Sequence, residues 1–117
     1  MSLFNRIAGT EEPKIGIWPI MTDFTRVLDQ EVGFGLSELA TKYDLSQEEQ
    51  TEAGAYLQHL GSMVQDRATS LVANGIGANL ATEIARSVVD AKFRHGLLRA
   101  EVGTITEQQF KDNLGMV

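Results

Sequence analysis

One long helix is the strongest structural signal in this sequence. The stretch Ser46-Gln47-Glu48-Glu49 has the capping-box pattern, in which a serine and a glutamate three residues later bond each other's backbone amides. Apolar residues then recur at helical spacing from Ala53 to Val72, and Asn74-Gly75 is a typical helix stop. We therefore predict a helix over 46–73. At 1.5 Å per residue it is about 42 Å long, so it must be the spine of a chain of 117 residues.

A second long helix is predicted over 79–100. Only five residues connect it to the first, so the two helices should form an antiparallel hairpin. Three charged residues, Arg86, Asp90 and Arg94, share one face at a spacing of four, which is typical of a charge ladder along a helix. The apolar residues that we expect to face the first helix are Leu80, Ala81, Ile84, Ala85 and Val88.

Shorter helices complete the predicted fold. Apolar spacing indicates helices over 21–32, which would include Val32, and over 36–43. A second capping box, Thr106-x-x-Gln109, begins a C-terminal helix that ends near Leu114. The sequence therefore predicts one all-α domain over 1–117, a small helical bundle in which the shorter helices pack on the long hairpin.

Residues 1–19 are predicted to form an irregular N-terminal arm. Lys14-Ile15-Gly16-Ile17-Trp18-Pro19 alternates apolar residues, and a proline disfavours the helical conformation of the residue before it, so this segment should be extended. The apolar side chains of Ile15, Ile17 and Trp18 need a place to be buried. Either they close one end of the core, or the arm docks on a neighbouring subunit.

Small residues recur along the spine at every seventh position, at Gly54, Gly61 and Ala68. A glycine inside a helix costs about 1 kcal/mol relative to alanine. A regular line of such residues indicates close approach by another helix, and the alternative is that these residues lie by accident on a solvent-facing surface.

The charge of the chain argues against a generic nucleic-acid binder. Ten Lys and Arg residues oppose 16 Asp and Glu residues, which gives a net charge of −6, whereas phosphate binding requires cations. The exception is a basic stretch over 92–99, with Lys92, Arg94, His95 and Arg99 and no acidic residue. These side chains either extend over the helix end, or bind an acidic partner such as the Glu-rich start of the 46–73 helix on a second copy, or contact an anion or a nucleic acid.

The sequence offers little for catalysis or metal binding. It contains no cysteine, and its two histidines, His59 and His95, are not in metal-ligand spacing. No Ser-His-acid or paired-carboxylate arrangement can be assigned, so we expect no enzyme, no cofactor and no metal. A run of about 18 apolar residues and a secretory signal are both absent, so we expect no membrane partner and a cytoplasmic or virion location rather than secretion.

Residues 36–52 have the spacing of a helix-turn-helix, which favours a regulatory adaptor as the alternative function. Leu39-Ala40, Asp44-Leu45 and Ser46 stand at the offsets of that motif. The second helix would present Glu48, Glu49 and Glu52 to DNA, however, and carboxylates repel phosphates.

The middle of the chain resembles a known group of proteins. The order Ile15-x-Ile17, an apolar helix with Phe24 and Leu28, a glycine break, and Tyr43-Asp44-Leu45-Ser46-x-x-Glu49 before a long helix covers residues 15–65. It is similar to small, uncharacterised helical proteins encoded among the virion structural genes of tailed bacteriophages. The resemblance implies a structural or assembly protein, such as a virion or head–tail component, whose partners are further copies of itself or another structural protein. It assigns no active-site residue.

Overall fold

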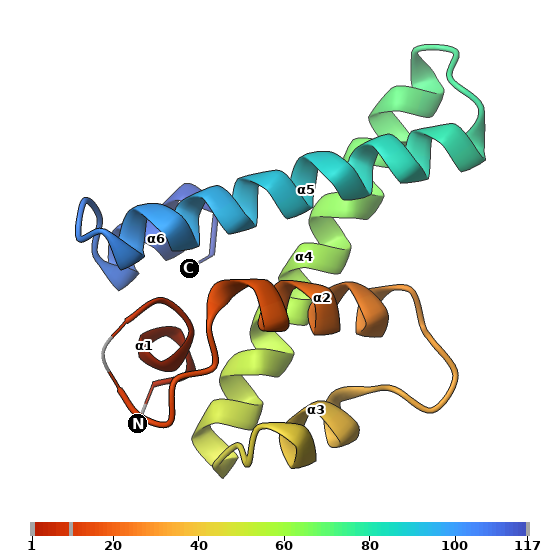
Figure 1. The fold of residues 1–117 in the computed structure, drawn as a ribbon. Helices are drawn as coiled ribbons and strands as arrows, with labels where there is room; N and C mark the ends of the chain where they lie inside the picture. The colour runs from red at the N-terminus through yellow and green to blue at the C-terminus, as the bar shows by residue number, and fades with distance from the viewer. Residues whose placement is uncertain (1, 10, 117) are drawn as a thin grey trace.

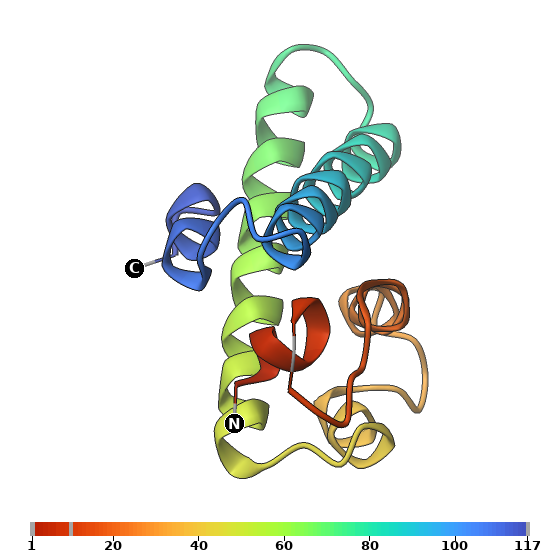
Figure 2. The same cartoon turned by 60° about the vertical axis from the view of Figure 1, so that its left-hand side comes forward.

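The computed structural model describes residues 2–9 and 11–116, which form an all-helical bundle without strands (Figure 1). The six helices are α1 (Leu3–Ala8), α2 (Ile17–Leu28), α3 (Leu36–Lys42), α4 (Gln47–Ala73), α5 (Ala78–Glu101) and α6 (Glu107–Asn113). Figure 2 shows α4 running through the full height of the molecule, with the other helices arranged around it. The predicted all-α fold built on a long hairpin is confirmed.

Helix α4 begins and ends where its sequence signals place it. The amide of Glu49 donates to Ser46 Oγ at 3.2 Å, and the amide of Ser46 donates to Glu49 Oε1 at 3.0 Å, which completes the capping box. At the other end, Gly75 has a φ of +92°, a conformation that glycine adopts without the steric cost borne by other residues. The predicted range 46–73 is therefore confirmed, with Ser46 as the N-cap.

Helix α5 packs against α4 through a narrow stripe of residues spaced four apart. The buried members are Ala81, Ala85, Val89, Phe93 and Leu97. The prediction that Leu80 faces α4 is wrong, because its side chain is 56% exposed, whereas Val88, which is 38% exposed, lines a cavity with Met63 and Arg67 of α4. The stripe is centred one position later than the apolar pattern suggested, because the small side chains of Ala81 and Ala85 lie at the contact with α4.

The N-terminal residues are part of the folded body. Leu3 and Ile7 of α1 are fully buried in the same core as the longer helices. The predicted extended segment over 14–19 is wrong from Ile17 onward, because α2 begins there with Gly16 as its N-cap. Pro19 then lies in the first turn, where a missing N–H breaks no bond of the helix.

Helix α2 also ends earlier than predicted. Its last residue is Leu28, and Val32, expected on the apolar face, is 99% exposed in the following loop. Gln30 and Gly33 both have positive φ, which the helix cannot accommodate. The predictions for α3 and α6 hold to within a residue or two.

A cluster of aromatic rings joins the helices. Phe93 of α5 lies 6.0 Å from Phe24, 5.7 Å from Tyr56 and 5.4 Å from Phe110, measured between ring centroids. Phe110 also lies 5.3 Å from Phe4 of α1. These rings link α1, α2, α4, α5 and α6 into one core, and aromatic pairs of this kind contribute about 0.5–1.5 kcal/mol each beyond their burial.

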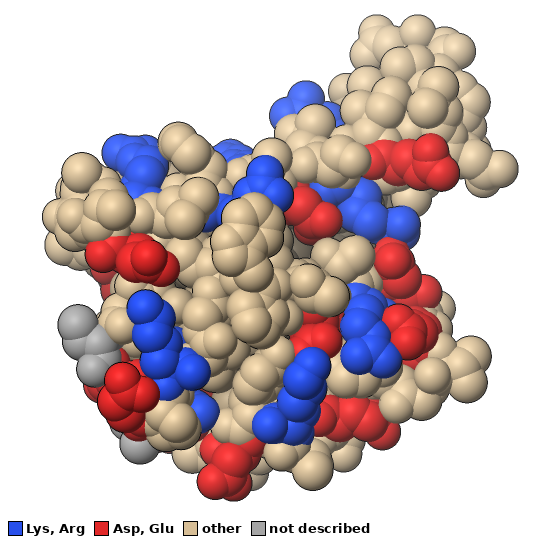
Figure 3. Space-filling view, viewed as in Figure 1, with Lys and Arg blue, Asp and Glu red and all other residues tan. Residues whose placement is uncertain are grey.

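The far end of the α4–α5 hairpin projects beyond this body. Figure 1 shows the last turns of α4 and the first turns of α5 standing apart from the other helices. In the space-filling view of Figure 3, the same end forms a protrusion with few charged side chains on the visible face. We call this end the hairpin tip and define it as residues 64–84.

Candidate functional site

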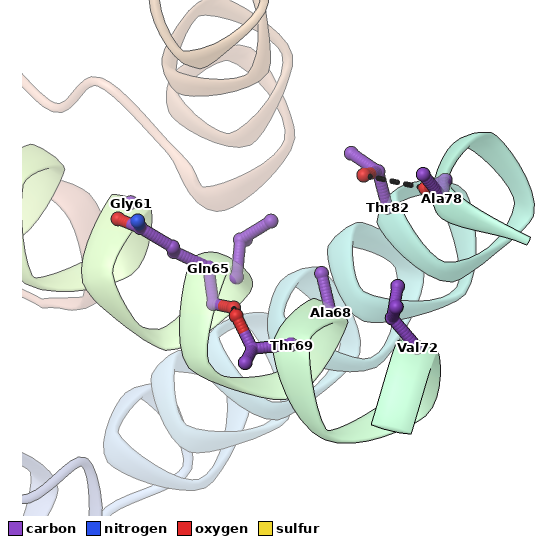
Figure 4. A pocket seen from close by; sticks show the side chains of 8 residues that line it. Gly61, Gln65, Ala68, Thr69, Val72, Ala78 and Thr82 are labelled. Carbon is purple, nitrogen blue, oxygen red and sulfur yellow. Dashed lines mark hydrogen bonds between the residues drawn. The ribbon is translucent and has the colours of Figure 1, made fainter. Parts of the chain in front are cut away.

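A groove runs between α4 and α5 where the tip leaves the body. Its volume is about 430 Å³. Its lining residues come from both helices: Gly61, Val64, Gln65, Ala68, Thr69, Val72, Ala78 and Thr82. Figure 4 shows the α4 residues along one wall and Ala78 and Thr82 on the other. The groove therefore opens along the hairpin beyond the end of α2, whose Leu28 lies beside Gly61.

Small side chains create this groove. The predicted line of Gly54, Gly61 and Ala68 divides into two parts in the structure. Gly54 and Gly61 lie under Leu36 and Leu28, whose methyl groups would be 3.6 and 3.7 Å from an added Cβ. Leucine side chains from α3 and α2 therefore make the predicted close approach at these two positions. Gly61 and Ala68 both line the groove, and no helix covers the part beside Ala68 in the described chain.

The groove offers an apolar surface with few free polar groups. Thr69 Oγ1 donates to the carbonyl of Gln65 at 2.9 Å, and Thr82 Oγ1 donates to the carbonyl of Ala78 at 3.0 Å. Their donors are thus used within their own helices, and Val64 and Val72 supply aliphatic walls. Val72 is 47% exposed, although an aliphatic side chain gains about 1.5–3 kcal/mol from complete burial.

A second apolar row lies on the opposite side of α5. Leu80, Ile84 and Val88 follow one another at a spacing of four, so they stand in line along the helix. Leu80 and Val88 are exposed, and Ile84 is half-buried. Leu80 is two residues from both Ala78 and Thr82, so at 100° per residue it points roughly 200° away from the groove. We call Leu80, Ile84 and Val88 the ridge.

The structure separates the predicted interaction residues of the arm. Ile17 is buried in the core and Ile15 packs against it half-buried. Trp18 is 63% exposed, and the guanidinium carbon of Arg94 lies 5.2 Å from the centroid of its ring. Two of the three side chains thus close the core, and Trp18 pairs with a cation across the α2–α5 interface.

The predicted charge ladder on α5 bonds to α2 rather than along its own helix. Arg86 Nη1 lies 2.9 Å from Asp29 Oδ1, and Thr25 Oγ1 donates to Asp90 at 3.3 Å. Burial raises the pKa of Asp90, although the Thr25 hydroxyl and the charge of Arg86 oppose the rise. The ladder therefore contributes to the packing of two helices.

The remaining predicted basic residues gather elsewhere. Lys92, His95 and Arg99 line a separate pocket of about 350 Å³ between α5 and α6. Arg94 is on another face of α5, beside Trp18. The basic stretch 92–99 is thus split between two surfaces.

The proposed acidic partner surface at the start of α4 is not free, so that prediction is corrected. Glu49 is 1% exposed and forms an ion pair with Arg6 at 2.9 Å. Glu52 accepts the amides of Phe4 at 2.8 Å and Leu3 at 3.3 Å, so it caps the N-terminus of α1. Only Glu48 of the three carboxylates remains exposed without a partner in the described chain. Neither role could be predicted from the sequence, because nothing local to α4 reveals contacts with α1.

Helices α3 and α4 follow one another across a short turn at residues 43–46, within residues 36–52. The exposed residues at the start of α4 include Gln47, Glu48 and Thr51, and Glu38 and Asp44 are exposed on the α3 side. This surface is acidic where a DNA reader would present cations.

Two further features are absent from residues 2–9 and 11–116. Within these ranges, no group of three or more His, Cys, Asp or Glu side chains is placed to hold a metal ion. Over the same residues, none of the helices combines the length and the apolar character needed to cross a bilayer.

Sequence and fold comparisons give no guide to function. No protein-family model, no curated protein and no solved structure matches this chain.

Proposed function

We propose that this protein is a non-enzymatic structural or assembly protein that acts by binding further copies of itself through the hairpin tip. The setting that its sequence resemblance suggests is the virion of a tailed bacteriophage, where it would serve as a head–tail or related component. The single observation that carries the proposal is the apolar groove on a tip that projects from an otherwise well-packed body.

The shape of the groove favours a helix as its occupant. It follows α4 from Gly61 to Val72, about three helical turns, and it is bounded by the start of α5. Packing between helices inserts a row of side chains on one into a groove on another. The occupant must therefore present a row of exposed aliphatic residues spaced three or four apart.

The ridge of a second copy meets this requirement. Leu80, Ile84 and Val88 supply three aliphatic side chains in line, and Leu80 and Val88 are exposed. Because the groove and the ridge lie on different sides of the hairpin, the contact joins unlike surfaces. Contacts of this head-to-tail kind form closed rings or open filaments rather than simple two-fold dimers.

Sedimentation velocity over a range of protein concentrations tests this proposal. We expect the wild-type chain to form species larger than a dimer as concentration rises. Val72→Asp places a charge in the groove and should leave the chain monomeric. Val32→Asp is the matched control, because Val32 is an exposed valine in the loop after α2. A wild-type chain that stays monomeric at every concentration would overturn the proposal.

A further inference from the structure

The pocket between α5 and α6 combines a basic rim with an apolar floor. Lys92, His95 and Arg99 of α5 and Asn113 of α6 form the rim, and Gly96, Phe110 and Leu114 complete the lining. We propose that this pocket binds an oxyanion, either a carboxylate or a phosphate monoester, that is attached to an apolar group. This proposal concerns a surface separate from the hairpin tip and does not depend on self-association.

The rim carries positive charge without a neighbouring counter-charge. Five basic residues in the body, Arg6, Arg26, Lys42, Arg86 and Lys111, form ion pairs with carboxylates. Lys92, His95 and Arg99 form none within 4.0 Å in the described part of the chain. The chain as a whole has a charge of −6, so these three adjacent basic residues are a local exception that attracts anions.

Two carboxylates adjoin this rim without forming an ion pair with it. Asp112 adjoins Asn113 in the sequence, but its Oδ1 accepts a hydrogen bond from Gln108 Nε2 at 2.9 Å. Asp66 shares a different cavity with Lys92 but forms no ion pair with it in the described part of the chain. An incoming oxyanion would therefore meet N–H donors from Lys92, His95, Arg99 and the Asn113 amide.

The floor of the pocket explains why the ligand should also be apolar. Phe110 and Leu114 are almost completely buried, and each contributes to the lining. The Phe110 ring lies directly against the backbone of Gly96, where an added Cβ would be 2.8 Å from Cδ1 and Cε1. Gly96 therefore allows the ring to approach α5, and leaves a depression between the Lys92–His95 turn and Arg99.

Helix α6 holds this pocket in a fixed geometry. Its N-terminus is closed by the Thr106 capping box, with the amide of Gln109 donating to Thr106 Oγ1 at 3.1 Å. Its C-terminus is tied to α4, where His59 Nε2 contacts the carbonyl oxygen of Leu114. Because α6 is already held in place, ligand binding loses less free energy to ordering of the site.

A titration followed by NMR of the ¹⁵N-labelled full chain tests the proposal. The probes are benzoate for a carboxylate source, phenyl phosphate for a phosphate source, and benzyl alcohol as the neutral analogue. We expect saturable shifts at the amides of Gly96 and Asn113 with at least one of the two anions, and weaker effects with benzyl alcohol. Tighter binding of benzoate would identify the ligand's anionic group as a carboxylate, and tighter binding of phenyl phosphate would identify it as a phosphate monoester.

Charge-matched variants separate a defined site from general electrostatic attraction. Arg99→Gln should weaken binding of the anion by about tenfold, as expected for loss of one charge-assisted hydrogen bond. Arg67→Gln on α4 removes the same charge from a residue that does not line this pocket, and it should weaken binding by much less than Arg99→Gln does. Lys92→Gln serves as the second test if Arg99→Gln does not fold, as judged by circular dichroism. Equal weakening by Arg67→Gln, binding of benzyl alcohol as tight as that of the anions, or no saturable shift would overturn the proposal.

Discussion

Arg6 of α1 and Glu49 of α4 form an ion pair in which both side chains are almost completely buried. Arg6 Nη1 lies 3.0 and 2.9 Å from the two carboxylate oxygens of Glu49. The rest of the guanidinium donates to the carbonyls of Pro13 and Tyr43, each at 2.9 Å. Burial would raise the pKa of Glu49, but hydrogen bonds from the Ser46 amide and from Arg6 outweigh it, and the pKa is lowered. One arginine thus ties the N-terminal residues to α3 and to the start of the spine.

Removing one member of this pair should strongly destabilise the fold. Arg6→Met leaves the Glu49 carboxylate buried without its cation, and Glu49→Gln leaves the guanidinium without its anion. Breaking a buried ion pair in this way costs about 3–5 kcal/mol. Urea unfolding at neutral pH measures the change in the free energy of unfolding for each variant.

The double variant Arg6→Met/Glu49→Gln provides the control. Because it leaves no unpaired charge, its loss of stability should be smaller than the sum of the two single losses. Strict additivity of the two single effects would contradict the coupling seen in the structure.

Asp23 should make stability depend on pH in the acid range. Burial would raise its pKa, but hydrogen bonds from Lys42 and Tyr43 and the charges of Lys42 and Arg26 lower it below the ordinary value of 3.8. A group whose pKa is lower in the folded state stabilises the protein when ionised, and this contribution is lost as pH falls through the folded pKa. It should therefore be present at about pH 5 and above and decline from about pH 4 downward.

Comparison with Asp23→Asn isolates that contribution, since other titrating groups are common to both proteins. The wild type should be more stable than the variant at about pH 7, and the difference in unfolding free energy should shrink toward about pH 2. A difference that stays constant over this range, measured by urea unfolding at each pH, would argue against an ionised Asp23 held by α3.

Two glycines in helices should respond in opposite directions to replacement by alanine. At Gly96 the new methyl group would lie 2.8 Å from the Phe110 ring, and overpacking of this kind costs about 1–3 kcal/mol. At Gly61 the methyl group would make an ordinary contact of 3.7 Å with Leu28, so the helix gains up to about 1 kcal/mol. Thermal unfolding should show a lower Tm for Gly96→Ala and a higher one for Gly61→Ala. A higher Tm for Gly96→Ala would mean that the Phe110 ring does not rest on Gly96, and a lower Tm for Gly61→Ala would mean that Leu28 leaves no room for a methyl group there.

Trp18 provides an optical test of the α2–α5 interface, because it is the only tryptophan in the chain. Its side chain is 63% exposed, so its fluorescence should be that of a tryptophan in water and should be quenched readily by acrylamide. Arg94→Ala removes the cation beside the ring and should increase quenching without unfolding the protein, since such pairs contribute only about 0.5–1 kcal/mol at exposed sites. An emission spectrum typical of a buried tryptophan, unchanged over a range of protein concentrations, would contradict the exposed position of Trp18.

Local sequence signals predicted much of the helical framework. Some of these signals depend only on bonds within a few residues, so they can be recognised in the sequence. They are the capping boxes at Ser46 and Thr106 and the helix stop at Asn74-Gly75. The start of α2 could not be predicted from the proline rule, because that rule is a steric bias against a helical Trp18, and burial of Ile17, Ile20 and Phe24 on one face of the helix outweighs it. The end of α2 was misplaced because Val32 fits the apolar period, although positive φ angles at Gln30 and Gly33 end the helix before it.

The candidate sites could be predicted only in part. The spacing of Gly54, Gly61 and Ala68 signalled close packing, but only the tertiary arrangement shows that Leu36 and Leu28 cover the two glycines. Likewise, Lys92, His95 and Arg99 were recognisable as a basic group. Their pocket depends on Phe110 and Asn113 of α6, which lie beyond the turn that follows α5.

Mixing two variants tests the central claim, that the ridge of one copy binds the groove of another, most directly. Val72→Asp blocks the groove and keeps the ridge, whereas Leu80→Asp blocks the ridge and keeps the groove. Each variant alone should be monomeric in sedimentation velocity. An equimolar mixture should form a one-to-one complex and nothing larger, since it retains a single intact contact. A mixture that remains monomeric, or single variants that assemble as the wild type does, would contradict the claim.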